Sequence, residues 1–303
     1  MQLLPDINSL QCQTCATIGF FDGVHRGHQF LLERLKRCAS EKNLPTLVVT
    51  FADSPARLLS PNSQVQLLTT PTEKIALLSQ SGIDYCLMLN FDEKLVKLRA
   101  EEFLALLHRH FGVRHLLLGY DHHFGSDGLS ELADYQKIGE KIGVDIAQAE
   151  PLKIDGKIVG SRIIRQLLAD GKVERANALL GYDYTLSGTV QHGQAIGRTI
   201  GFPTANLAVA PRKLLPRGGV YAIETKISSK KHRGLLNIGT RPTISGGEQT
   251  VEAHIIDFDG DIYGKILTIK VQHRLRDEQK FASLTELEHQ IEIDRNRLLI
   301  EGN

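Results

Sequence analysis

Short apolar segments alternate with amphipathic ones along the first part of the chain. The apolar run CATIGF (15–20) leads through a Gly/Asp turn into HQFLLERLKRCASEKN (28–43), which has the periodicity of an amphipathic helix. TLVVTF (46–51) follows and is again apolar and β-branched. A strand, a helix and a second strand in this order predict a parallel pair of strands joined by a right-handed crossover.

The alternation continues to about residue 180. Helices are expected at 73–82, 100–112 and 129–143, each followed by an apolar strand, at 85–91, 114–120 and 144–150. Two further helical segments, 161–171 and 173–181, end this part of the chain. Strands as apolar as these are typical of sheets covered by helices on both faces. The sequence therefore predicts a doubly wound parallel sheet that binds ligands at the carboxyl ends of its strands.

The pattern changes at Tyr184. Consecutive extended segments are expected at 185–191, 219–227, 233–239, 250–258 and 265–272. The turns between them are marked by Ser-Ser-Lys-Lys (228–231), Gly246-Gly247 and Asp259-Gly260. Such a series is typical of an antiparallel barrel or sandwich, and we expect a β-barrel with a terminal helix that starts near the capping box Ser283-Leu-Thr-Glu. The predicted domains are residues 1–182 and 183–303.

Composition and charge narrow the classes of function. The 303 residues are enough for two domains, and formal net charge is +1. Residues 1–182 contain 20 basic and 21 acidic side chains and residues 183–303 contain 16 and 14, so neither domain is expected to bind nucleic acid. We also expect no membrane partner, because no apolar run approaches the roughly 18–20 residues that span a bilayer. The sequence leaves the oligomeric state open.

The four cysteines indicate a reducing, cytoplasmic location. The start MQLLPDINSL lacks the basic and long apolar regions of a signal peptide. Cys12 and Cys15 form a C-x-x-C pair, but no second ligand pair follows at the spacing of a zinc site. Since Cys15 opens an apolar run, we expect it to be buried in a strand.

The first motif with chemical potential is TIGFFDGVHRGH (17–28), at the first strand–helix junction. Amide groups and the positive dipole end at a helix N-terminus attract phosphate. His25 and His28 are three residues apart, so both imidazoles can face one side and donate to a phosphate attacked at its α-phosphorus. The ATP-binding set expected here is completed by the residues Gly19, Phe21, Asp22, Gly23 and Gly27. The alternative is a pair of exposed histidines in a surface loop.

The second motif is GRTIGFPTANL (197–207), at the start of the β-rich part. Its phosphate-binding candidates are Gly197, Arg198, Gly201 and Pro203. Thr204 and Asn206 alternate on an extended segment and would face one side, where hydroxyl and amide oxygens suit Mg²⁺ beside ATP phosphates. A purely structural Gly/Pro turn is the alternative.

Glu252 is the third candidate, in VEAHIIDF. Its neighbours Val251 and Ala253 face the other side of the expected strand. An isolated glutamate in this setting usually faces solvent. It is a candidate general base if a hydroxyl nearby must lose a proton to attack a γ-phosphate.

With these motifs in order, the chain resembles the bifunctional riboflavin kinase/FAD synthetases of bacteria along its whole length. The resemblance also includes LTTPTEK (68–74), AEEF (100–103), GYDHHFG (119–125), LLGYDY (179–184), and NIGTRPT (237–243). It implies that the C-terminal barrel phosphorylates riboflavin to FMN with ATP. It further implies that the N-terminal domain transfers AMP from ATP to FMN, releasing pyrophosphate and making FAD.

The resemblance also implies roles for single residues. Thr204 and Asn206 would hold Mg²⁺ and the phosphates, and Glu252 would act as the base on the ribityl hydroxyl. His25 and His28 would bind the ATP phosphates during adenylyl transfer. The resemblance also implies that the triphosphate contacts Ser161, Arg162 and Arg165, and that the flavin contacts Asp121.

Three departures from the family pattern lie in the N-terminal domain. Ser54 stands in a family P-H-P element, His123 replaces a common arginine or other polar residue, and Arg162 replaces a small hydroxyl residue. Arg162 either takes over phosphate charge, since its guanidinium group suits phosphate, or crowds the site.

Several other functional interpretations compete with that of a bifunctional enzyme. One is a riboflavin kinase whose adenylyltransferase site is weakened or lost. Another is a nucleotidyltransferase for a different phosphorylated metabolite, which would leave the barrel and its P-T-A-N element without a function. The last is a non-enzymatic flavin-binding regulator, and the joint presence of both histidines, Thr204, Asn206 and Glu252 speaks against such decay.

Overall fold

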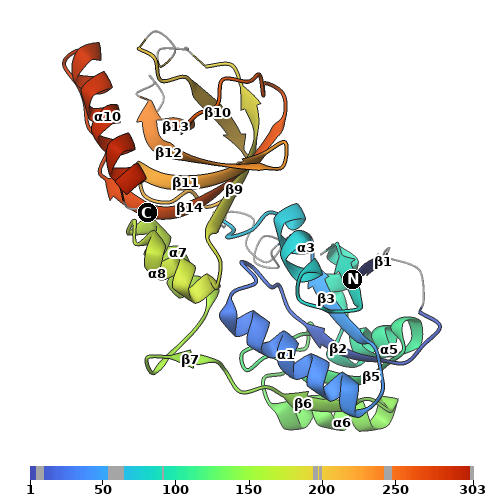
Figure 1. The fold of residues 1–303 in the computed structure, drawn as a ribbon. Coiled ribbons are helices and arrows are strands. Elements are labelled where there is room, and N and C mark those ends of the chain that lie inside the picture. The colour runs from blue at the N-terminus through green and yellow to red at the C-terminus, as the bar shows by residue number, and fades with distance from the viewer. Residues whose placement is uncertain are drawn as a thin grey trace. The chain divides into compact units, whose positions relative to one another are not determined.

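The chain forms two compact units. The computed structural model describes residues 1–4, 10–53, 65–90, 92–193, 197, 200–241 and 248–300. The first unit consists of residues 1–65 and 69–160, and the second of residues 66–68 and 161–303. Figure 1 shows a parallel sheet with helices in the first unit and a barrel in the second.

The first unit is built on a six-stranded sheet in the order β1-β4-β3-β2-β5-β6, with every pair parallel. Its strands are β1 (Gln2–Leu4), β2 (Thr14–Ile18), β3 (Thr46–Phe51), β4 (Tyr85–Leu89), β5 (Val113–Leu118) and β6 (Asp145–Gln148). The chain begins at the edge strand β1, crosses to β2, adds β3 and β4 on one side of β2, and then adds β5 and β6 on its other side. The order therefore reverses beside β2, where such folds bind ligands.

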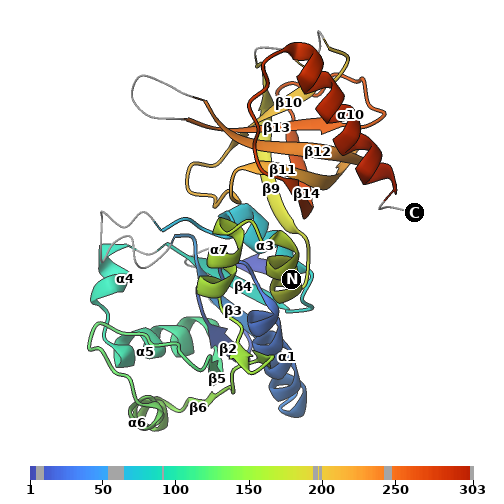
Figure 2. The same ribbon diagram turned by 90° about the vertical axis from the view of Figure 1, so that its left-hand side faces the viewer.

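Helices cover both faces of this sheet, as Figure 2 shows. They are α1 (Arg26–Glu41), α3 (Pro71–Ser79), α4 (Glu93–Lys97), α5 (Ala100–Phe111) and α6 (Leu132–Ile142). Alternate residues of the strands separate two cores: Cys15 packs with α1, whereas Ala16 and Ile18 pack with α5 and α6. Both faces are apolar for this reason, and the predicted doubly wound sheet is confirmed.

The second unit is a closed antiparallel barrel in the order β10-β13-β12-β11-β14-β9. Its strands are β9 (Tyr184–Gln191), β10 (Thr204–Val209), β11 (Gly219–Ile227), β12 (Lys230–Arg241), β13 (Glu248–Ile255) and β14 (Ile266–Arg276). Helices α7 (Ser161–Ala169) and α8 (Val173–Leu180) contribute buried side chains to the same core as the strands. The predicted barrel is confirmed. The division of the two activities at residues 182 and 183 stays a prediction.

The terminal helix α10 (Leu284–Ile300) lies along the outside of the barrel (Figure 1). Its Leu298 is fully buried against Leu235 and Leu275 of the strands. The hydroxyl of Ser283 accepts a hydrogen bond from the Glu286 amide at 3.2 Å, as the capping box predicts. The Glu286 carboxylate bonds instead to the Ala282 amide, one residue before the expected partner.

The sequence did not predict three small elements. The edge strand β1 and the five-residue helix α4 are too short to show a period. The third is the hairpin of β7 (Lys153–Ile154) and β8 (Lys157–Ile158), whose turn residues Asp155 and Gly156 have φ of +50° and +73°. An Asp-Gly pair is a recognised signal for such a tight turn.

Candidate functional site

The first candidate site is the turn between β2 and α1, at the carboxyl edge of the parallel sheet. Phe21, Gly23 and Val24 have φ of +53°, +81° and +36°. Positive φ costs a non-glycine residue on the order of 1–3 kcal/mol, and such strain concentrates at functional sites. A Cβ at Gly19 would lie 2.9 Å from the Phe21 ring, so only glycine leaves room for this tight turn.

His25 and His28 lie side by side at the start of α1, as their spacing predicts. Their rings stack with centroids 3.6 Å apart and planes 16° apart. His25 is the N-cap residue, and its Nδ1 accepts a hydrogen bond from the His28 backbone amide at 3.3 Å. The proton of neutral His25 is therefore on Nε2. A Cβ at Gly27 would lie 3.1 Å from the His25 ring, which explains the glycine between the two histidines.

The protonation state of His28 follows from its surroundings. Burial lowers the pKa of His28 well below its ordinary value, and the Coulombic effects of His25 and Lys74 lower it further. Its Nδ1 is buried and has no hydrogen-bond partner within the described part of the chain. His28 is therefore a neutral imidazole near pH 7, able to donate one hydrogen bond without carrying a charge.

Asp22 holds the turn in place. Its buried carboxylate accepts hydrogen bonds from the Thr69 amide at 3.0 Å and the Thr69 hydroxyl at 3.2 Å. The Gly23 amide donates to the same hydroxyl at 3.0 Å. Thr69 was not predicted as a site residue, although it lies in the LTTPTEK segment that the sequence analysis singled out. The phosphate-binding role predicted for Asp22 and Gly23 stays a prediction.

Lys74 is a second residue that the sequence analysis missed. Its side chain is buried, and its ammonium group donates to the Phe20 carbonyl at 2.8 Å and the Phe51 carbonyl at 2.7 Å. The same group lies 4.0 Å from the centre of the Phe20 ring. Burial lowers the pKa of Lys74 to about 8, although the carboxylates of Asp22 and Asp53 act in the opposite direction.

A cavity of about 320 Å³ lies in the same unit. Its walls come from the end of β3, from α4 and α5 and from the segment after β5, and include Phe51, Leu95, Leu98, Phe103, His122, His123 and Phe124. Asp121, the predicted flavin-side residue, is exposed and directly precedes this segment. Burial lowers the pKa of His122 to about 4, and its buried Nε2 has no partner among the described residues.

The predicted triphosphate residues Ser161, Arg162 and Arg165 begin α7, which belongs to the second unit. Arg162 is exposed, whereas the Arg165 guanidinium group donates to the Gln66 carbonyl at 3.0 Å. Their contact with ATP stays a prediction. Ser54 lies outside the described residues.

The second candidate site is a row of polar side chains across three neighbouring strands of the barrel. Asn206 on β10 pairs with Glu252 on β13, and Glu252 pairs with Asn237 on β12. Directly opposed residues in an antiparallel sheet share a face, with Cβ atoms about 4.5–5.5 Å apart. Thr204 lies two residues before Asn206 on that face, while Val251 and Ala253 are buried in the core. Asn237 was not predicted, although it opens the NIGTRPT motif.

Two glycines that precede β10 pack closely against neighbouring atoms. A Cβ at Gly193 would collide with the side-chain amide of Asn206, and one at Gly197 would collide with the Phe202 carbonyl. Gly193 therefore packs directly against Asn206, one of the two predicted metal ligands. Gly201 has φ of +80°, which also favours glycine. Arg198 lies outside the described residues.

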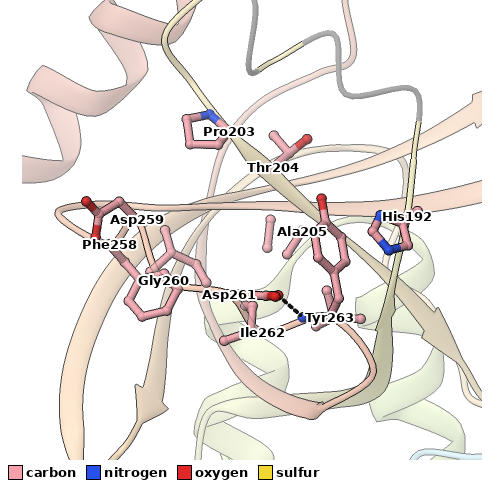
Figure 3. Close-up of a pocket in the computed structure, with 13 residues that line it drawn as sticks. His192, Pro203, Thr204, Ala205, Phe258, Asp259, Gly260, Asp261, Ile262 and Tyr263 are labelled. Carbon is pink, nitrogen blue, oxygen red and sulfur yellow. Dashed lines mark hydrogen bonds between the residues drawn. The ribbon is translucent and has the colours of Figure 1, made fainter.

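A cavity of about 650 Å³ adjoins the row (Figure 3). Pro203 and Thr204 lie at one end, and the Phe258 ring lies on one side. On the other side, the Tyr263 ring stacks on His192 with centroids 3.8 Å apart. A cavity with aromatic walls and a hydroxyl at its mouth suits a ligand with a planar ring and a phosphate chain.

No helix among the described residues is long and apolar enough to cross a membrane. These residues also contain no cluster of three or more His, Cys, Asp or Glu side chains suited to a metal ion. The predicted metal ligands Thr204 and Asn206 instead offer a hydroxyl and an amide oxygen. All four cysteines are free, and Cys15 is buried in β2, as predicted.

Comparisons with known proteins match both units. The FAD synthetase family model matches residues 7–163, and the riboflavin kinase family model matches residues 180–299. The bifunctional riboflavin kinase/FMN adenylyltransferase of Escherichia coli K12 is 40% identical over 280 residues, covering 92% of this chain and 89% of that protein. The protein of the same name from Bacillus subtilis is 33% identical, covering 97% and 94%.

One solved structure matches nearly the whole chain. It is a crystal structure of a Streptococcus pneumoniae protein described as a macrolide-efflux protein, with a TM-score of 0.87 and 33% identity. The match covers 96% of this chain and 95% of that one. The agreement in fold is thus close over both units, while the described function of that protein differs from those of the sequence relatives.

Proposed function

The chain belongs to the family of bifunctional riboflavin kinase/FMN adenylyltransferases, and we propose that its barrel makes FMN while its α/β unit converts FMN to FAD. It is an enzyme with both a kinase and an adenylyltransferase activity. Its substrates in this proposal are riboflavin, FMN and ATP. The four free cysteines support a reducing, cytoplasmic setting.

In the barrel, the row on the outer face supplies the groups for phosphoryl transfer. The ring of ATP enters the cavity between Phe258 and Tyr263, and its phosphates reach Thr204 at the mouth. The hydroxyl of Thr204 and the amide oxygen of Asn206 fit Mg²⁺, because both are oxygen ligands on one face and the Gly193 backbone packs against Asn206. When bound there, Mg²⁺ would neutralise phosphate charge.

Glu252 is the base in this proposal. Its carboxylate neighbours Asn206 in the row, where it can accept the proton of the riboflavin 5′-hydroxyl. The hydroxyl oxygen forms a bond to the γ-phosphorus, the bond from that phosphorus to the β-bridging oxygen breaks, and ADP leaves. Asn237, on the other side of Glu252, restricts the positions of the carboxylate.

In the α/β unit, His25 and His28 donate hydrogen bonds to the α-phosphate of ATP. A phosphate oxygen of FMN attacks the α-phosphorus, and pyrophosphate leaves. Negative charge grows on the α-phosphate oxygens in this step, and two fixed donors stabilise it. The strained turn at 21–24, held by Asp22, keeps both rings in place before ATP arrives.

The cavity beside the 122–128 segment is the proposed site of the flavin ring. Its walls include the rings of Phe51, Phe103 and Phe124. Aromatic and apolar walls suit a planar tricyclic ring, and Asp121 next to them is placed to contact the polar part of the flavin.

The observation that carries the proposal is the presence, in one chain, of two polar clusters of different construction that each suit phosphate chemistry. A stacked histidine pair lies in one unit, and the in-register Asn206–Glu252 pair lies in the other. One enzyme with both activities accounts for both. A nucleotidyltransferase for another metabolite would leave the barrel row unexplained.

The test supplies purified protein with riboflavin, ATP and Mg²⁺ and separates riboflavin, FMN and FAD by chromatography. FMN and FAD should both form, and FAD should also form when FMN replaces riboflavin. The absence of FAD in both arms, with FMN formed from riboflavin in the first, would contradict the adenylyltransferase half. Formation of FAD only from added FMN would contradict the kinase half.

A further inference from the structure

Lys74 is a buried charge that neither proposed reaction uses. A buried ammonium group is costly unless it is paired or hydrogen-bonded. Here it is bonded to two main-chain carbonyls, those of Phe20 and Phe51, and faces the Phe20 ring. Methionine would fill such a space without this cost, so a lysine at this position calls for a functional explanation.

The two carbonyl groups that Lys74 binds both lie at the carboxyl ends of neighbouring strands. Phe20 lies two residues beyond the end of β2, immediately before the strained turn, and Phe51 is the last residue of β3. β2 and β3 are adjacent parallel strands. Lys74 therefore ties together two carboxyl strand ends at the edge where the stacked histidines lie.

The charge of Lys74 also reaches the histidines. It is among the groups that lower the pKa of His28, together with burial and His25. The groups that act on Lys74 itself are Asp22 of the turn, Asp53 after β3, and Cys86 of β4. The ammonium group is thus the positively charged member of this group of interacting residues near the His25–His28 pair, and it favours the neutral form of His28.

We propose that Lys74 is a positioning residue for adenylyl transfer: it joins the ends of β2 and β3 and places a buried ammonium group near the His25–His28 pair. This inference rests on the proposed adenylyltransferase function. Lys74 acts through the turn, which it keeps in place, and through His28, whose neutral form it favours in addition to the larger effect of burial. Its charge also adds to the attraction of the site for the triphosphate.

The test compares Lys74→Met, which removes the charge but fills the space, with Lys74→Arg, which keeps the charge. Lys137→Met, on the exposed face of α6, is the matched control. Adenylylation of FMN by Lys74→Met should fall by roughly tenfold or more, the size of effect that loss of supporting contacts has at other sites. Riboflavin phosphorylation should stay within twofold, and Lys74→Arg should recover part of the adenylylation rate.

The pH profile separates this role from simple support of the fold. Without the charge at position 74, the pKa of His28 rises toward its ordinary value. The acid side of the kcat/KM profile for adenylylation should therefore move to higher pH in Lys74→Met and stay in place in Lys74→Arg. A folded Lys74→Met protein with wild-type rate and an unshifted profile would overturn the proposal.

A measurement on the unmodified protein keeps the inference testable if the substitutions prevent folding. NMR titration of the His28 ring should show a pKa below the ordinary value, and a normal pKa would overturn the proposal. The proposed function fails separately: wild-type protein would then not adenylylate FMN at all, whatever the state of His28.

Discussion

The two proposed phosphate sites are built in opposite ways. In the α/β unit, the continuous stretch of residues 21–28 supplies the strained turn, the N-cap and both histidines. In the barrel, single residues of three strands supply the site, and only the register of the sheet brings Asn206, Glu252 and Asn237 together. A local site depends on the conformation of its own backbone, whereas a site spread over strands depends on the whole sheet.

The environments of the sites also differ. Asp22, Thr69 and Lys74 are buried near the His25–His28 pair, and burial is the main cause of the low pKa of His28. The polar row of the barrel lies on the outer face of the strands and is partly exposed, and Gly193 packs closely against its Asn206. The first site should therefore respond to pH and to changes in buried charge, and the second to changes in ligand oxygens and backbone room.

The largest effect is expected at Glu252. Glu252→Gln keeps the size of the side chain but removes the base, so riboflavin phosphorylation should fall by roughly 10²–10⁴-fold. ATP affinity should change little, and adenylylation of supplied FMN should continue. Steady-state rates of the two reactions check this, and kinase activity within a few-fold of wild type would make Glu252 an ordinary surface residue.

His28→Ala should have the mirror-image effect. Loss of one preorganised donor costs on the order of 10²–10³-fold in rate, so FAD formation should collapse while FMN formation continues. The measurement is the yield of both flavins from riboflavin in folded protein. Equal loss of both activities would show that the sites are not independent and would break the comparison.

A third effect concerns stability at acid pH and should be confined to the α/β unit. His122 has a folded pKa of about 4 against an ordinary value near 6.5, so below pH 6.5 the unfolded chain binds a proton that the folded chain does not. Stability should therefore be lost as pH falls from 6.5 to 4, by up to about 3 kcal/mol. Urea unfolding of wild type and His122→Phe at several pH values tests this, since the free energy of unfolding of the variant should fall less between pH 6.5 and 4.

Gly193→Ala sharpens the comparison from the barrel side. The added methyl group collides with the Asn206 amide and should displace this proposed ligand by a fraction of an ångström. Misplacement near 1 Å can cost 10²-fold, so we expect a loss of about tenfold in the kinase reaction. Adenylylation of supplied FMN in the same protein is the control. An unchanged kinase rate would mean that Asn206 does not need this packing.

The difference between the sites also explains what the sequence could predict. The pattern of apolar residues predicted both folds. Strands buried on two faces are short apolar runs between amphipathic helices, whereas strands buried on one face alternate apolar and polar residues. That both histidines face one side was predictable from a three-residue spacing at a helix start, whereas the stacking of their rings was not. Lys74, Thr69 and Asn237 were not, since their roles depend on contacts between segments far apart in the chain. Their motifs, LTTPTEK and NIGTRPT, were visible without revealing what each residue touches.

The smallest effect is a difference between the rates of the two reactions. The kinase elements Thr204, Asn206 and Glu252 follow the family pattern, whereas the adenylyltransferase part departs from it at His123 and Arg162. His123 lines the proposed flavin cavity, and Arg162 is exposed in the first turn of α7. An arginine keeps the positive charge but cannot reproduce the short reach of a hydroxyl group. We therefore expect adenylyl transfer to be the slower step.

With riboflavin and excess ATP, FMN should then build up before FAD appears, and the ratio of the rates should be a few-fold. Time courses of the three flavins measure it directly. Arg162→Ser, which restores a small hydroxyl residue, should shorten the period in which FMN accumulates if the arginine is responsible. FAD that rises in step with the loss of riboflavin, with no detectable FMN, would show that His123 and Arg162 are working replacements.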